Sequence, residues 1–176
     1  GLSGAGKSTL AKVLFIKLQE CQERPVSLLD GDIVRRHLSS ELTFSREHRN
    51  LNVQRIGFVA SEITKNRGIA LCAPIAPYPE SRQQVREMIS PWGAFIEIHM
   101  STPLSVCEQR DRKGLYAKAR AGVIHGVTGV DDPYVPPENP ELRIDTSAST
   151  PQEAADLVLD YLVQRQLIAA VCTPRI

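Results

Sequence analysis

The feature that most constrains this chain is its first eight residues, Gly-Leu-Ser-Gly-Ala-Gly-Lys-Ser, which match the pattern GxxxxGK[ST] at every specified position. Glycines let such a loop curl so that its N–H groups point at phosphate oxygens, and a following helix adds its positive end. In this pattern Lys7 reaches the β- and γ-phosphates and the Ser8 hydroxyl ligates Mg²⁺. The motif therefore predicts a nucleotide-phosphate site, with a glycine-rich turn that binds nothing as the alternative.

Hydrophobic spacing predicts the elements that follow the loop. Apolar residues at helical intervals predict helices over residues 7–23, 45–66 and 151–166, and shorter ones through Val34 and Leu38 and over 81–89 and 103–110. Short apolar runs predict buried strands at 26–29, 69–73, 94–99 and 142–145. Strands that alternate with helices predict an α/β protein of the P-loop NTPase fold, with a parallel sheet, helices on both faces and ligands at the carboxyl ends of the strands.

The domain organisation follows from length and from one irregular segment. The 176 residues fit a single domain. Residues 111–140 have little periodicity and are rich in Lys, Arg, Gly and Pro, so we interpret them as a mobile basic lid. Because the glycine motif normally follows a buried strand, we expect residues 1–176 to be truncated at the motif and the native chain to extend upstream by at least one apolar strand.

Composition excludes several classes of partner. Lys and Arg number 21 against 20 acidic residues, so no overall field favours nucleic acid or a membrane surface. No apolar run reaches the length of a membrane span. The cysteines Cys21, Cys72, Cys107 and Cys172 have no metal-ligand spacing, and we expect reduced thiols in a cytoplasmic protein.

Two carboxylates follow the strand predicted at 26–29. Phosphoryl transfer to an alcohol needs an acidic group near Mg²⁺ and one that accepts or positions the hydroxyl proton, and Asp30 and Asp32 have the right chemistry. A turn or helix cap is the alternative for such a pair. We assign Asp30, with Ser8, to the metal, and Asp32, with Lys7, to catalysis.

Basic and aromatic side chains follow on the next segments. Arginine suits bidentate recognition of phosphate or sulfate, so Arg35 and Arg49, with Asn52 beside them, are candidate anion ligands. Exposed helix arginines are the alternative. Phe44 is either a core residue or a platform for a base.

The chain resembles the adenylylsulfate kinase family over almost its whole length. The most specific block is Lys113-Gly114-Leu115-Tyr116 within residues 110–120. The remaining matches are Gly1 to Thr9, Leu29 to Asp32, Phe44-Ser45 with Arg49 and Asn52, Ile75 with Pro77-Tyr78, Thr128-Gly129, Asp131 to Tyr134, and Asp145-Thr146.

The resemblance implies an activity and a set of site residues. Members of this family use ATP and Mg²⁺ to phosphorylate the 3′-hydroxyl of adenosine 5′-phosphosulfate (APS), giving 3′-phosphoadenylyl sulfate and ADP. The implied ATP contacts are Gly1, Leu2, Ser3, Gly4, Ala5, Gly6, Lys7, Ser8, Thr9 and Arg110. The implied APS contacts are Asp32, Arg35, Phe44, Arg49, Asn52, Ile75, Lys113, Lys118 and Val127.

Three positions depart from the family pattern. Ala76 stands where the family commonly has a serine proposed to carry phosphate, so no phosphoserine can form at this position. Val127 stands where a second aromatic residue usually completes an adenine sandwich with Phe44, and Pro79 replaces an arginine.

Two other functions remain open at this stage. Another small-molecule P-loop kinase, of the gluconate or shikimate type, would share the glycine loop but has no reason to carry Phe44 with the Lys-Gly-Leu-Tyr block. A non-catalytic nucleotide-binding regulatory domain would not need Lys7, Ser8 and Asp32 intact. The resemblance also leaves open a homodimer and covalent fusion to an ATP sulfurylase domain.

Overall fold

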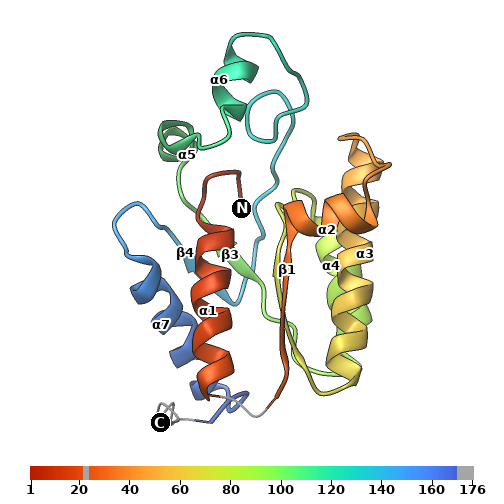
Figure 1. The fold of residues 1–176 in the computed structure, drawn as a ribbon, viewed down its shortest axis with the longest axis vertical. Coiled ribbons are helices and arrows are strands. Elements are labelled where there is room, and N and C mark those ends of the chain that lie inside the picture. The colour runs from red at the N-terminus through yellow and green to blue at the C-terminus, as the bar shows by residue number, and fades with distance from the viewer. Residues whose placement is uncertain (22–23, 170–176) are drawn as a thin grey trace.

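Figure 1 shows the fold in a computed structural model, which describes residues 1–21 and 24–169. Helices and strands alternate along most of the chain. In chain order they are α1 (Lys7–Cys21), β1 (Val26–Asp30), α2 (Gly31–Leu38), α3 (Arg46–Lys65), β2 (Ile69–Ala73), α4 (Pro79–Ile89), β3 (Ile98–Met100), α5 (Leu104–Arg110), α6 (Leu115–Arg120), β4 (Leu142–Ile144) and α7 (Pro151–Gln164).

All four strands of the described residues are paired in parallel, as predicted, but they form two separate pairs. β1 pairs with β2, with Val26 opposite Ile69. β3 pairs with β4, with Ile98 opposite Leu142. The expected single sheet is therefore divided between β2 and β3 within the described residues.

Helices cover the strands on both sides, which confirms the predicted architecture. Figure 1 shows α1 and α7 on one side and α3 and α4 on the other. Leu10 and Leu14 of α1 pack with Val158 of α7 in one core cluster, together with β3 and β4 residues. Val53 of α3 and Val85 of α4 belong to a second cluster, against which β1 and β2 residues pack.

Short polar sequences start the helices that border the site. Asp30 caps α2 by accepting a hydrogen bond from the Asp32 amide, and Ser45 caps α3 through the His48 amide. Thr150 and Glu153 form a reciprocal capping box at α7. These caps satisfy amides that have no partner within the helix, so the local sequence sets where each helix begins.

Several boundaries differ from the prediction. The strand predicted at 94–99 begins only at Ile98, and the helix predicted at 81–89 begins two residues earlier, at Pro79. The last two residues of the helix predicted at 7–23 lie outside the described residues. The segment predicted to be an irregular lid contains helix α6, because Asp111 accepts hydrogen bonds from the amides of Leu115 and Ala117 and Tyr116 is buried.

The cysteines also correct one expectation. Cys21 is disulfide-bonded, whereas Cys72 and Cys107 are free thiols, so the prediction of four reduced cysteines is wrong at Cys21. Cys172 lies outside the described residues. Within the described part of the chain, none of the helices has the length and apolar character needed to span a membrane.

Candidate active site

One cleft, of about 470 Å³, brings most of the predicted site residues together. It lies at the carboxyl ends of β1 and β2 and at the amino end of α1, where a parallel α/β fold is expected to bind its ligand. The predicted residues that line it are Ser3, Gly4, Gly6, Lys7, Ser8, Thr9, Asp30, Asp32, Arg35, Phe44, Arg49, Asn52, Ile75, Arg110 and Lys113.

The glycine loop is curled in front of α1. Gly4 and Gly6 have φ of 76° and 95°, a region that side chains rarely adopt, so glycine is required for this path. The Lys7 ammonium donates a hydrogen bond to the Leu2 carbonyl oxygen at 2.6 Å and thereby crosses the loop. Burial lowers the pKa of Lys7 to about 8, and a nearby anion would stabilise the charged ammonium and raise this pKa.

Ser8 and Asp30 form a pair of oxygen ligands at the end of β1. The Ser8 hydroxyl donates to Asp30 Oδ2 at 2.5 Å, while Oδ1 accepts from the Asp32 amide at 3.0 Å. Burial acts to raise the pKa of Asp30, but the hydrogen bonds from Ser8 and from backbone amides outweigh it and hold the pKa below its ordinary value. Asp30 is therefore a carboxylate at neutral pH.

Asp32 and Lys113 connect the strand edge to the lid segment. Lys113 donates a hydrogen bond to Asp32 Oδ2 from a position 81 residues further along the chain. Both side chains are more than half exposed, at 59% for Lys113 and 67% for Asp32. An exposed ion pair contributes little stability, so either partner can exchange it for a ligand at small cost.

Phe44 stands at the mouth of the cleft beside two guanidinium groups. Its side chain is exposed, and the Arg35 guanidinium carbon lies 4.3 Å from the ring centroid. Arg49 lies 5.4 Å from the same centroid. The predicted alternative of a core residue is excluded, and Phe44 is positioned to stack on a planar group.

Arg49 is almost completely occupied by protein contacts. Its guanidinium donates to the carbonyl oxygens of Phe44 and Gly126 and to the Thr128 hydroxyl, at 2.5 to 2.8 Å. Its Nε atom also lies 3.1 Å from Asp132 Oδ2. With only 8% of the side chain exposed, Arg49 holds residues 126–132 against α3 as well as facing the cleft.

Asn52 contributes to the cleft wall a hydrogen-bond acceptor, Oδ1, to which none of the described residues donates. The residue is 8% exposed, and no hydrogen-bond partner for its Oδ1 atom exists among the described residues. A buried acceptor left without a partner costs about 1–3 kcal/mol. A ligand that donates a hydrogen bond inside the cleft would remove this cost.

Comparisons with known proteins agree with this geometry. The sequence profile of the family described as adenylylsulphate kinase matches residues 1–145. The chain belongs to the adenylylsulphate kinase family. It is 49% identical to an adenylyl-sulfate kinase of Halothermothrix orenii over 96% of this chain and 89% of that protein.

Two further comparisons extend the family assignment. A solved structure of the Mycobacterium tuberculosis APS kinase in complex with AMPPNP and APS matches with a TM-score of 0.87 and 41% identity, over 92% of this chain and 93% of that one. A sulfate adenylyltransferase of Aspergillus oryzae is 54% identical over 84% of this chain, which spans only 26% of that protein. The P-loop kinase fold predicted from the sequence is confirmed.

Five residues expected at the adenylylsulphate kinase site do not line the cleft. Ala5, within the glycine loop, is completely buried, and Leu2 packs against a core cluster. Gly1 lines a different cavity. Val127 is 4% exposed and belongs to the core, and Lys118 is exposed on α6. The substitution of Val for an aromatic residue therefore changes core packing at this position and adds no open surface to the cleft.

Two residues to which the sequence assigned no site role, Tyr116 and Thr146, donate hydrogen bonds to carbonyl oxygens of the glycine loop. The Tyr116 hydroxyl donates to the Ser3 carbonyl oxygen at 2.9 Å, and the Thr146 hydroxyl donates to that of Ala5 at 3.3 Å. Arg110, which was predicted to contact ATP, also donates to the Thr146 hydroxyl and to the Gly4 carbonyl oxygen. Tyr116 and Thr146 belong to the blocks that carry the family resemblance, which was the available signal.

Ala76 has an unusual backbone conformation in the cleft wall. Its φ of 46° is rare for a residue with a side chain, and its carbonyl oxygen accepts a hydrogen bond from Arg82 at 2.9 Å. The methyl group has no oxygen that could carry phosphate. The neighbouring departure, Pro79, is the first residue of α4, where proline is favoured.

Proposed function

We propose that this chain transfers the γ-phosphate of ATP to the 3′-hydroxyl of APS, forming 3′-phosphoadenylyl sulfate and ADP. The observation that carries the proposal is the cleft itself, in which the glycine loop and Ser8–Asp30 lie beside Asp32, Phe44 and Asn52. A phosphate site and a nucleotide-sized acceptor site in one cleft fit direct transfer between two nucleotides.

The glycine loop and Lys7 would bind the phosphates of ATP. The amino end of α1 and the loop amides favour negative charge, and Lys7 would exchange the Leu2 carbonyl oxygen for phosphate oxygens. Its pKa would rise on contact with phosphate, so the ammonium charge is strongest where the transferred group is most negative.

Ser8 and Asp30 fit a magnesium site. A hydroxyl and an ionised carboxylate 2.5 Å apart are hard oxygen ligands of the kind Mg²⁺ prefers. Mg²⁺ at phosphate-transfer sites is commonly held by one or two protein ligands together with phosphates and water, so these two oxygens could suffice on the protein side. Bound Mg²⁺ would neutralise charge on the transferred phosphate.

Asp32 would accept or position the proton of the attacking hydroxyl. To do so it must leave Lys113, and Lys113 is then free to contact phosphate or sulfate. Arg35 and Lys113, which line the cleft, would add positive charge around the two nucleotides. Because Ala76 cannot carry phosphate, transfer passes in line from ATP to the acceptor.

Phe44 and Asn52 would recognise the acceptor nucleotide. The exposed ring of Phe44 offers one stacking face, and Asn52 Oδ1 offers an acceptor to an N–H group such as an adenine amine. Ile75 contributes apolar surface to the same wall. A planar, amine-bearing base satisfies both groups, whereas gluconate or shikimate would leave them unused.

The test is ADP release in a coupled assay with Mg-ATP alone and with APS, gluconate or shikimate added. We expect turnover only with APS and its loss in Lys7→Ala, with the circular dichroism and thermal midpoint of the folded protein retained. Turnover with gluconate or shikimate instead would contradict the choice of acceptor. Nucleotide binding without turnover on any acceptor would favour a regulatory domain.

Four expectations from the sequence stay predictions. They are a cytoplasmic location, a single domain over residues 1–176, a homodimer and covalent fusion to an ATP sulfurylase. The match to the Aspergillus oryzae sulfate adenylyltransferase, of which this chain spans 26%, supports the fusion as an arrangement that exists among relatives.

A further inference from the structure

The segment that joins β2 to α4 forms part of the cleft wall in a strained backbone conformation. Its residues Ile75, Ala76 and Pro77 line the cleft. Ala76 has a φ of 46°, in the left-handed region, which is unfavourable for a residue with a side chain. Such a conformation persists only where surrounding contacts impose it, so contacts from neighbouring elements must hold this segment.

Arg82 of α4 makes one such contact from outside the cleft. Its guanidinium donates a hydrogen bond through Nη1 to the Ala76 carbonyl oxygen at 2.9 Å, and its side chain is only 10% exposed. Arg82 is not among the residues that line the cleft. Any effect of Arg82 on a ligand bound there would therefore pass through the segment that contains Ala76.

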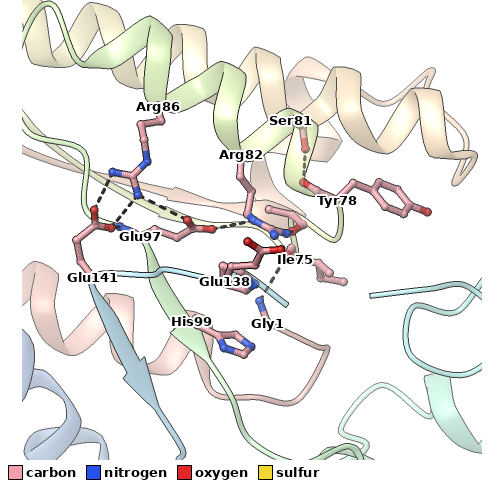
Figure 2. A network of polar contacts seen from close by, with 12 residues as sticks. Gly1, Ile75, Tyr78, Ser81, Arg82, Arg86, Glu97, His99, Glu138 and Glu141 are labelled. Carbon is pink, nitrogen blue, oxygen red and sulfur yellow. Dashed lines mark hydrogen bonds and ion pairs between the residues drawn. The ribbon is translucent and has the colours of Figure 1, made fainter. Parts of the chain in front are cut away.

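A chain of ion pairs fixes the Arg82 side chain, as Figure 2 shows. Arg82 Nε lies 2.8 Å from Glu97 Oε1, an oxygen that has no hydrogen-bond partner among the described residues, so this contact is one of charge. Arg86, one helical turn after Arg82, donates to both oxygens of Glu141 at 2.7 and 2.9 Å and lies 3.6 Å from Glu97 Oε2. Glu97 is thus held between two arginines, and Arg82 has one partner on each side, Glu97 and Ala76.

The segment lies on the side of the cleft assigned to the acceptor nucleotide. Ala76 packs against the core cluster that contains Val53 of α3, and the residue before Val53 is Asn52, which faces the cleft. The Pro77 carbonyl oxygen accepts a hydrogen bond from the Val135 amide at 2.9 Å. A change in the conformation of the segment would therefore alter the wall beside Asn52.

We propose that Arg82 is a positioning residue for the acceptor nucleotide, because its hydrogen bond to Ala76 holds residues 75–77 in the strained conformation that forms the acceptor wall. The identity of the acceptor as APS rests on the proposed function. Without this hydrogen bond the segment would populate other conformations, and the apparent affinity for the acceptor would fall in proportion to the fraction of molecules that keep the wall. Saturating acceptor would restore the wall, so kcat would change little.

The test compares Arg82→Gln with Arg86→Gln, a matched control on the same face of α4. A hydrogen bond from a charged donor shifts an equilibrium by about tenfold or more, so Arg82→Gln should raise the KM for APS by about that factor and leave kcat within about threefold. Arg86→Gln removes ion pairs but no contact to residues 75–77. It should lower the thermal midpoint and leave the KM for APS within about twofold of that of the unaltered chain.

The substitution Ala76→Gly tests whether the effect passes through the strained residue. Glycine adopts a positive φ without steric cost, so the segment should keep its conformation more often when the hydrogen bond from Arg82 is absent. The rise in KM caused by Arg82→Gln should therefore shrink to about threefold or less when both proteins compared carry Ala76→Gly. If Arg82→Gln does not fold, Arg82→Lys replaces it, since lysine keeps a cation beside Glu97 but lacks the planar fork.

Hydrogen exchange at the Val135 amide supplies a readout that needs no turnover. Because this amide donates to the Pro77 carbonyl oxygen, it should exchange at least about fivefold faster in Arg82→Gln and at an unchanged rate in Arg86→Gln. If the unaltered chain does not phosphorylate APS, the proposed function fails and this exchange alone decides the role of Arg82. Equal exchange in Arg82→Gln and the unaltered chain would then overturn that role.

Three outcomes with an active enzyme would also overturn the proposal. The first is a KM for APS in Arg82→Gln that stays within about twofold of that of the unaltered chain. The second is an equal rise in Arg86→Gln, which would show a general effect of losing the ion pairs. The third is an equal rise in the presence of Ala76→Gly, which would show that the effect does not pass through the strained residue.

Discussion

Arg49→Lys separates two roles for the arginine that the sequence assigned to substrate recognition. The Arg49 side chain is 8% exposed, and its guanidinium donates to Thr128 and Gly126, which lie 79 and 77 positions away. A lysine keeps the charge but has one ammonium group in place of the planar fork, so it cannot reach all these acceptors and Asp132 together. A role limited to anion binding would leave stability unchanged.

The expected cost follows from the acceptors that lose a donor. At about 1–3 kcal/mol for each buried acceptor left without a partner, the loss of the contacts to residues 126–132 costs about 2–4 kcal/mol. For a domain of this size each kcal/mol corresponds to about 2–4 °C, so the thermal midpoint should fall by about 5–15 °C.

The control is Arg46→Lys on the same helix. Arg46 pairs with Glu80 at 2.7 Å, but its side chain is 60% exposed, so we expect a change of about 0.5 kcal/mol or less. Midpoints are measured by circular dichroism without nucleotide. Equal midpoints for the two variants would refute the structural role of Arg49 and would leave substrate binding as its only proposed role.

Three further predictions follow from single residues. Burial lowers the Lys7 pKa to about 8, and bound phosphate would hold the proton, so Mg-ATP affinity measured by calorimetry should be constant below pH 8 and fall above it. Lys7→Met should bind Mg-ATP weakly and show no such fall above pH 8. An equal fall in that variant would assign the pH dependence to another group. Val127→Phe overpacks a site that is 4% exposed and should lower the free energy of unfolding by about 1–3 kcal/mol, whereas Val123→Phe, at a position 69% exposed, should leave the thermal midpoint unchanged. If Val127→Phe bound APS more tightly without loss of stability, the core placement of residue 127 would be contradicted. Incubation with γ-labelled ATP should leave the protein unlabelled, because Ala76 has no oxygen; label that added APS chases into product would show a covalent intermediate elsewhere.

The parts of the site that lie close together along the chain could be predicted from the amino-acid sequence. The glycine loop with Lys7 and Ser8 is contiguous, and the capping role of Asp30 depends on an amide two residues away. The predicted strand and helix order was confirmed except for α6, because hydrophobic periodicity records which face of each element is buried. Helix α6 was missed because six residues are too short for periodicity to detect.

Contacts between residues that are distant along the chain could be identified only in the folded protein. Arg49 and Thr128 are 79 positions apart, Tyr116 and Ser3 are 113 apart, and local spacing contains no information about such contacts. The core position of Val127, in a cluster with Leu14 of α1 and Tyr116 of α6, and the unpaired Asn52 Oδ1 likewise depend on contacts between segments that are far apart in the chain. The division of the strands into the pairs β1–β2 and β3–β4 also depends on long-range pairing, which the pattern within each strand does not specify.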